Sequence, residues 1–80
     1  MQVAVHSLEK TLYAGEAEKL ICKTPQGQIT VLDRHIPLVT LLAGPKVEVV
    51  GRAGERTAIP VSGGFMEVQP ESNVIILAAE

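Results

Sequence analysis

Glycine and proline divide this chain into short runs rich in valine and isoleucine, separated roughly every eight to twelve residues. This spacing is typical of a β-sandwich or barrel, and a helical period is sustained nowhere. We therefore predict an all-β domain, a small flattened sandwich of roughly eight to ten short strands. The expected strands cover residues 3–8, 17–24, 28–32, 38–43, 46–52, 55–61, 65–69 and 73–79.

Three of these runs also indicate where they lie in a sheet. Val47 and Val49 alternate with polar residues, as in an antiparallel strand with one solvated face. Residues 74–78 are apolar on both faces, so we expect a central strand there. Pro45 and Pro60 lack the N–H that a β-ladder needs, which assigns them to sheet edges or bulges.

The length of 80 residues allows one domain, residues 1–80, because separate cores need roughly 50 residues each. Apolar residues make up 46% of the chain, but only Tyr13 and Phe65 are aromatic, so the predicted core is aliphatic. A domain of this size gains little net stability from its own core. Support from a partner surface is therefore expected.

Composition also limits the classes of partner. The net charge is −2 and the basic residues are scattered, which argues against nucleic acid as a partner. Cys22, the single cysteine, is expected to be a small buried hydrophobe on a strand. We expect a natural start at Met1 and a cytosolic or peripheral protein, since no run approaches a membrane span and the N-terminus lacks the features of a signal peptide.

No residue pattern predicts catalysis, a metal or a cofactor. Ser62 lacks the G-x-S-x-G context of a hydrolase nucleophile, and we expect an ordinary turn serine. His6 and His35 have no ligand at metal-binding spacing. The glycine-rich pieces at 43–46 and 62–65 lack the spacing of a phosphate-binding loop. The sequence therefore predicts a function in protein contact.

Two charged positions allow structural hypotheses. We expect Asp33 and Arg34 to pair weakly in a solvated loop. Glu67 lies between Met66 and Val68, and either faces solvent or is buried against a partner's cation. The sequence leaves both alternatives for Glu67 open.

Two glycines precede the strand that contains Glu67. We expect Gly63 and Gly64 to provide backbone conformations closed to other residues and to leave room for close packing.

Two ordered motifs resemble a known family. The segments DRHIPLVTLLAG (33–44) and VSGGFMEVQPESNVIILA (61–78) are similar to the N-terminal domain of the epsilon subunit of the bacterial F-type ATP synthase. The matching positions are His35, Pro37, Leu38 and Thr40 in the first motif and Ser62, Gly63, Gly64, Glu67 and Val68 in the second, with further matches at Ser7, Glu9, Tyr13, Gly15 and Gly27.

The resemblance implies a sandwich of two antiparallel sheets and a non-catalytic role without cofactors. It implies a central-stalk (rotor) subunit that joins the gamma subunit to the c-ring and couples proton or sodium flow to ATP synthesis, at the cytoplasmic face of the bacterial inner membrane. The implied gamma-facing residues are Ser7, His35, Ile36, Pro37, Leu38, Val39 and Thr40. The implied c-ring-facing residues are Pro25, Gln26, Gly27, Gln28, Ile29 and Thr30, and the implied structural residues are Gly15, Ser62, Gly63 and Gly64.

Three departures from the family pattern qualify these expectations. Gln28 replaces an acidic residue common in the c-ring-facing loop, and Arg34 replaces a glycine, so that turn is expected to differ in backbone shape. The C-terminal helical hairpin of the family is absent from residues 1–80, so we expect a short form without hairpin inhibition or ATP binding.

The alternative hypothesis is a free-standing β-sandwich that binds another partner or a small ligand, because a fold does not fix a function. A docking role predicts an exposed apolar patch near residues 36–39.

Overall fold

The computed structural model describes residues 1–79, and every regular element in it is a β-strand. This confirms the predicted all-β class. The strands are β1 (Gln2–His6), β2 (Thr11–Glu16), β3 (Lys19–Thr24), β4 (Gly27–Leu32), β5 (Leu38–Val50), β6 (Arg56–Pro60), β7 (Gly63–Gln69) and β8 (Asn73–Ala79). Two differences from the sequence prediction stand out: β2 was not predicted, and the runs at 38–43 and 46–52 form the single strand β5.

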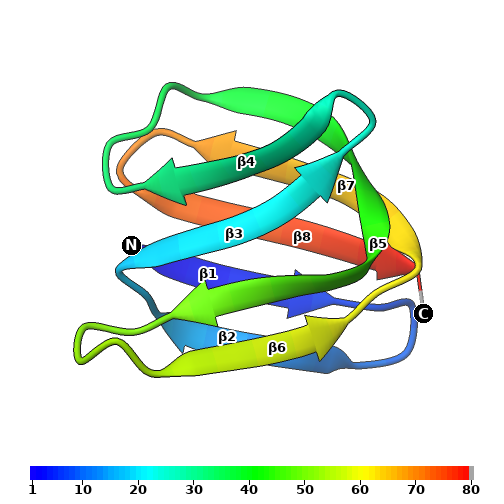
Figure 1. The fold of residues 1–80 in the computed structure, drawn as a ribbon, viewed down its shortest axis with the longest axis horizontal. Helices are drawn as coiled ribbons and strands as arrows, with labels where there is room; N and C mark the ends of the chain where they lie inside the picture. The colour runs from blue at the N-terminus through cyan, green and yellow to red at the C-terminus, as the bar shows by residue number, and fades with distance from the viewer. Residues whose placement is uncertain (80) are drawn as a thin grey trace.

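The strands follow one another in the order β2-β1-β8-β7-β5-β3-β4, and β6 pairs with β5. They form two packed layers, with β1, β2, β7 and β8 behind β3, β4 and β6 in Figure 1. β5 belongs to both layers, since residues 38–43 pair with β7 and residues 46–50 pair with β6. The two layers of the predicted sandwich are therefore parts of one continuous sheet that folds on itself at β5.

One strand pair in this sheet is parallel. β1 and β8 come from opposite ends of the chain and run in the same direction, with Val3 opposite Val74 and Val5 opposite Ile76. No short turn joins these two strands, so no hairpin imposes an antiparallel direction on them. β8 lies between β1 and β7, which confirms its predicted central position.

The bend in β5 lies at Gly44 and Pro45. A side chain at Gly44 would approach the carbonyl oxygen of Val61 to 2.6 Å, and that carbonyl belongs to the connection between β6 and β7. Val61 in turn donates its N–H to the carbonyl of Pro45 at 2.9 Å. Pro60 lies on β6, which pairs only with β5. Pro60 therefore lies on an edge strand, as predicted, and Pro45 lies in the part of β5 where the pairing with β3 shifts register.

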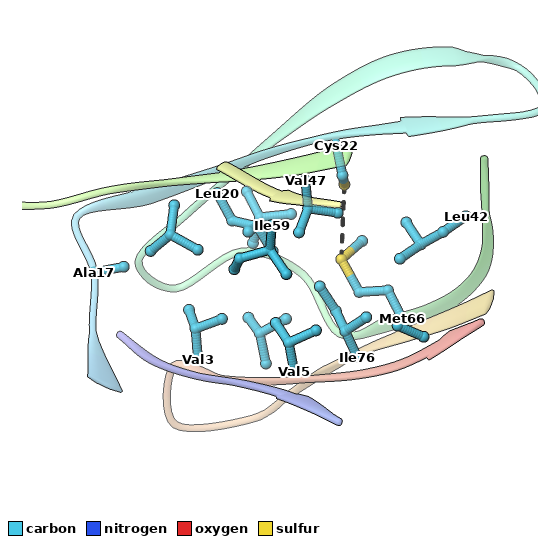
Figure 2. Close-up of a cluster of buried hydrophobic side chains, with 14 of the residues drawn as sticks. Val3, Val5, Ala17, Leu20, Cys22, Leu42, Val47, Ile59, Met66 and Ile76 are labelled. Carbon is cyan, nitrogen blue, oxygen red and sulfur yellow. Dashed lines mark hydrogen bonds between the residues drawn. The ribbon is translucent and has the colours of Figure 1, made fainter. Parts of the chain in front are cut away.

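The core fills the space between the two layers with aliphatic side chains, as Figure 2 shows. Leu20, Val47, Met66 and Ile76 are completely buried. Cys22 is 1% exposed, and its thiol donates to the sulfur of Met66 at 3.8 Å. The prediction that Cys22 is a buried hydrophobe on a strand is confirmed.

The two glycines that begin β7 have the conformations that the sequence predicted. Gly63 has a φ of 149° and Gly64 a φ of 135°, both rare for L-residues. A side chain at Gly64 would collide with the carbonyl oxygen of Leu77 on β8. Ser62 just before them donates from Oγ to the carbonyl of Ala79 at 3.0 Å, as an ordinary turn serine can.

Gly15 is different, because its position does not demand glycine. A side chain there would come no closer than 3.4 Å, to the hydroxyl of the Tyr13 side chain, and the φ of Gly15 lies outside the region that favours glycine.

The loop between β4 and β5 corrects one prediction. Asp33 pairs with the α-ammonium group of Met1 at 2.8 Å, and not with Arg34. The same ammonium donates to the carbonyl of Ala17 at 2.9 Å and lies 3.4 Å from Glu16. The start of β1 is therefore tied to the β2–β3 and β4–β5 connections, which join the two layers.

Arg34 adopts a backbone conformation in which glycine is favoured. Its φ is 63°, in the left-handed region where glycine is favoured, and its N–H donates to Ser72 Oγ at 3.2 Å.

Candidate functional site

The polar side chains do not form a reactive centre in the described part of the chain. Within residues 1–79 no three His, Cys, Asp or Glu side chains gather closely enough to hold a metal ion. His6 Nδ1 lies 3.0 Å from Thr11 Oγ1, and His35 Nδ1–H donates to the carbonyl of Ile36 at 2.8 Å. Burial raises the pKa of the Cys22 thiol to about 11, which keeps it protonated and unreactive at neutral pH.

In the same residues, no helix is long and apolar enough to cross a membrane.

The most distinctive surface is the outer face of the sheet formed by β5, β7 and β8. The inner residues Met66 and Ile76 are buried, so by alternation their neighbours point outward. Those neighbours are also apolar: Phe65 is 54% and Leu77 57% exposed. We call this surface the apolar strip; its members are Leu8, Val39, Leu41, Phe65, Ile75 and Leu77.

Strand register makes the apolar strip continuous. Leu41 lies opposite Phe65, and Phe65 lies opposite Leu77. A groove of about 500 Å³ runs from Phe65 and Leu77 to Leu8 in the β1–β2 connection. A second hollow, of about 260 Å³, extends from the same two residues to Val39. Clustered apolar side chains on a monomer surface mark an interaction site more often than scattered ones.

The predicted gamma-facing residue Ser7 lies at one end of this strip. Its Oγ accepts hydrogen bonds from the N–H groups of Glu9 and Lys10 at 3.3 Å and donates to the Lys10 carbonyl at the same distance. Ser7 also lines the larger groove together with Leu77. Its side chain therefore holds the β1–β2 connection in place at the rim of the strip.

The other predicted gamma-facing residues, 35–40, point in different directions. Ile36 and Val39 are 78% and 70% exposed, which confirms the apolar exposure predicted there. Leu38 packs against the core, and Thr40 lies opposite the buried Met66, so both point inward. Pro37 is exposed and His35 is half-buried in the loop before β5.

The predicted c-ring-facing residues form the β3–β4 turn, a separate site. Thr24 holds this turn, accepting from the Gln26 N–H at 3.2 Å and donating to the Gly27 carbonyl at 2.9 Å. Gly27 has a φ of 125°, a conformation that favours glycine. Within the predicted set Ile29 is half-buried, and Pro25, Gln26, Gly27, Gln28 and Thr30 are exposed.

Sequence reasoning missed most of the apolar strip. Leu8, Leu41, Phe65, Ile75 and Leu77 were not proposed as interaction residues. The available signal was the run at 74–78, apolar on both faces, which was interpreted only as the mark of a central strand. One face of that run lines the core and the other faces outward.

The chain is an all-β sandwich that exposes one apolar sheet face, a surface of the kind that interaction sites use. The family model described as "ATP synthase, Delta/Epsilon chain, beta-sandwich domain" matches residues 1–80, and this chain belongs to that family. The resemblance found in the sequence motifs is thereby confirmed.

Individual relatives agree with this assignment. The chain is 42% identical over 78 residues to the ATP synthase epsilon chain of Laribacter hongkongensis, covering 95% of this chain and 55% of that one. It is 37% identical to the epsilon chain of Brevibacillus brevis, covering 95% of this chain and 58% of the relative. The chain thus spans little more than half the length of these curated relatives.

Solved structures show the same fold. A chain of the Euglena gracilis mitochondrial ATP synthase superposes with a TM-score of 0.90 at 24% identity, over 98% of this chain and 49% of that chain. A chain of the central stalk and c-ring assembly of the Tetrahymena thermophila mitochondrial ATP synthase gives 0.76 at 13% identity, over 99% and 63%.

Proposed function

We propose that this domain is a non-catalytic subunit of the central stalk of an F-type ATP synthase. In that role it joins the gamma subunit to the c-ring, so that ion flow through the ring is coupled to ATP synthesis. Within the complex, the subunit lies peripheral to the membrane, at the cytoplasmic face of the bacterial inner membrane. The observation that carries the proposal is the apolar strip, on a domain of the ATP synthase delta/epsilon family.

The apolar strip is the proposed gamma-binding surface. It adds the exposed side chains of β7 and β8 to the predicted stretch around Val39, and it reaches Ser7 at its far end. A stable interface buries a largely apolar core with a polar rim. Leu41, Phe65 and Leu77 fit the core of such an interface, while Ser7 fits the rim.

The β3–β4 turn is the proposed contact with the c-ring. Its tip exposes Gln26 and Gln28, whose amides both donate and accept hydrogen bonds. Contacts made through amides suit polar loops without requiring an opposite charge. The Thr24 hydrogen bonds keep the turn in one conformation, which lowers the entropy cost of binding.

The fold suits the transmission of torque. β5 passes through both layers, so a force applied to one layer reaches the other through one continuous backbone. The Met1–Asp33 pair connects the layers again at the edge of the sandwich. A rotor part must turn without deforming, and these links stiffen the domain between its two proposed contacts.

Co-purification from the source organism tests this proposal. We would tag the chain, solubilise the membranes gently and identify the proteins that come with it. The gamma, beta and c subunits should accompany the native sequence but not Leu77→Asp, which places a charge in the apolar strip. Leu32→Asp is the matched control, because Leu32 is 53% exposed on β4, outside the strip.

Circular dichroism and thermal unfolding would establish that both variants fold. If the native chain stays soluble and alone, or if Leu77→Asp recovers all three subunits, the proposed role is wrong. The alternative of a free-standing binding module would then direct a search for another partner.

A further inference from the structure

We infer that the hollow between β5, β7 and β8 receives a lysine or arginine side chain of the gamma subunit, whose cationic head pairs with Glu67. The inference rests on the proposed function and specifies the chemistry of one contact within it. It also chooses between the two environments that the sequence left open for Glu67.

Glu67 has apolar neighbours on the adjacent strands. On the outer face of the sheet, Glu67 lies between two apolar neighbours, opposite Val39 on one side and Ile75 on the other. Phe65, two residues earlier on the same strand, faces the same way. The Glu67 carboxylate therefore lies among apolar side chains. The strand pattern would equally allow a valine or isoleucine at this position.

The hollow beside Glu67 has the size and lining to hold a long cationic side chain. Its volume is about 260 Å³, and its walls include Val39, Phe65, Ile75 and Leu77, with Glu67 as its charged member. Lysine and arginine lay an aliphatic stem along apolar surface while their charged head stays in a polar position. A cation over an aromatic ring gains further attraction, and Phe65 is within this hollow.

The charge of Glu67 has no counter-charge in the described part of the domain. Among residues 1–79, Glu67 forms no ion pair, and its carboxylate accepts only a hydrogen bond of 3.3 Å from Gln69 Nε2. A partner that covered the strip with apolar groups alone would remove water from this carboxylate and would supply no hydrogen-bond donor in place of that water. Burying an unpaired charge is strongly unfavourable, whereas a desolvated, hydrogen-bonded pair adds affinity and fixes orientation. The complementary partner group is therefore a cation.

The test measures the affinity of the full chain for the gamma subunit of the same organism, at several salt concentrations. Glu67→Gln keeps the size and hydrogen-bonding capacity of the side chain but removes its charge. We expect it to weaken binding roughly 10- to 100-fold and to flatten the dependence of affinity on salt. Glu18→Gln is the matched control, an exposed carboxylate in the β2–β3 connection, and it should change neither quantity.

Leu77→Asp in the same assay separates this inference from the proposed function. If Leu77→Asp abolishes binding while Glu67→Gln binds as the native chain does, the cation pairing is wrong and the gamma-binding role stands. If Glu67→Gln weakens binding but leaves the salt dependence unchanged, the contact is a neutral hydrogen bond and the inference also fails. If Leu77→Asp binds normally, the strip is not the gamma-binding surface and both proposals fall. Circular dichroism of each variant checks that it is folded.

Discussion

At the scale of single residues, Arg34 holds a backbone conformation that costs an L-residue about 1 kcal/mol or more. Its φ of 63° is imposed by the tight connection between β4 and β5, where the N–H of Arg34 donates to Ser72 Oγ. Arg34→Gly removes the cost of that conformation but adds freedom to the unfolded chain. We predict a net gain of about 0.5–1 kcal/mol in the free energy of unfolding, measured by urea denaturation.

Arg34→Ala is the control for this prediction. It removes the same charge but retains the Cβ that disfavours a positive φ. Arg34→Ala should therefore leave the urea midpoint close to the native value. An equal gain for both variants would attribute the effect to the charge and not to the backbone.

At the scale of elements, the Met1 ammonium and Asp33 connect the start of β1 to the loop that follows β4. The hydrogen bond to Asp33 raises the pKa of the Met1 amine above its ordinary 8.0. The ammonium in turn lowers the pKa of Asp33 below its ordinary 3.8. The raised amine pKa contributes stability below about pH 8, which is lost as the pH rises through the raised value. The lowered Asp33 pKa contributes stability above about pH 4, which is lost as the pH falls through the lowered value.

We therefore predict that Asp33→Asn lowers the urea midpoint most near pH 6. The difference from the native chain should shrink in strong acid, where the carboxylate is protonated, and in alkali, where the amine is neutral. Glu16→Gln should have a smaller effect, because Glu16 lies farther from the ammonium, at 3.4 Å. A difference that stays constant from about pH 3 to pH 10 would show that the pair does not act through charge.

The elements also show how far the sequence could predict this fold. Alternating valines and turn residues predicted most of the strands, because each run carries its own pattern. β2 was missed because Leu12 and Tyr13 are adjacent and Gly15 follows, so no alternation is visible. β5 was divided in two because glycine and proline usually end a strand, whereas here Gly44 and Pro45 form a bend within one. Such a bend depends on packing against Val61, a long-range contact that no local pattern contains.

The interaction surface was predicted less completely than the fold. Ser7 and Val39 were found through family motifs; Val39 belongs to the apolar strip and Ser7 adjoins it. Phe65 and Leu77 were missed as surface residues because an apolar residue on a strand is ordinarily expected to be buried. Only the register that places β7 between β5 and β8 shows that their side chains share one exposed face.

At the scale of the whole molecule, the same two strands serve stability on one face and binding on the other. On β7, Met66 is fully buried while Phe65 is 54% exposed, although they are adjacent in sequence. On β8, Ile76 and Leu77 divide in the same way. The core of this small sandwich lies between its two layers, so side chains on the outer face do not pack in it. Packing of the isolated domain therefore does not account for the apolar residues on that face.

This division predicts that folding and binding can be separated by neighbouring substitutions. Met66→Ala should lower the free energy of unfolding by about 2–5 kcal/mol, because it leaves a cavity between the layers. Phe65→Ser should lower it by less than about 1 kcal/mol, because the ring is largely in solvent, yet it should weaken binding to the gamma subunit. Urea denaturation and affinity measurements on the same two proteins would check both effects. Equal destabilisation by the two substitutions would mean that the outer face also contributes to the folding core, and an unchanged affinity of Phe65→Ser would mean that its ring has no role in binding.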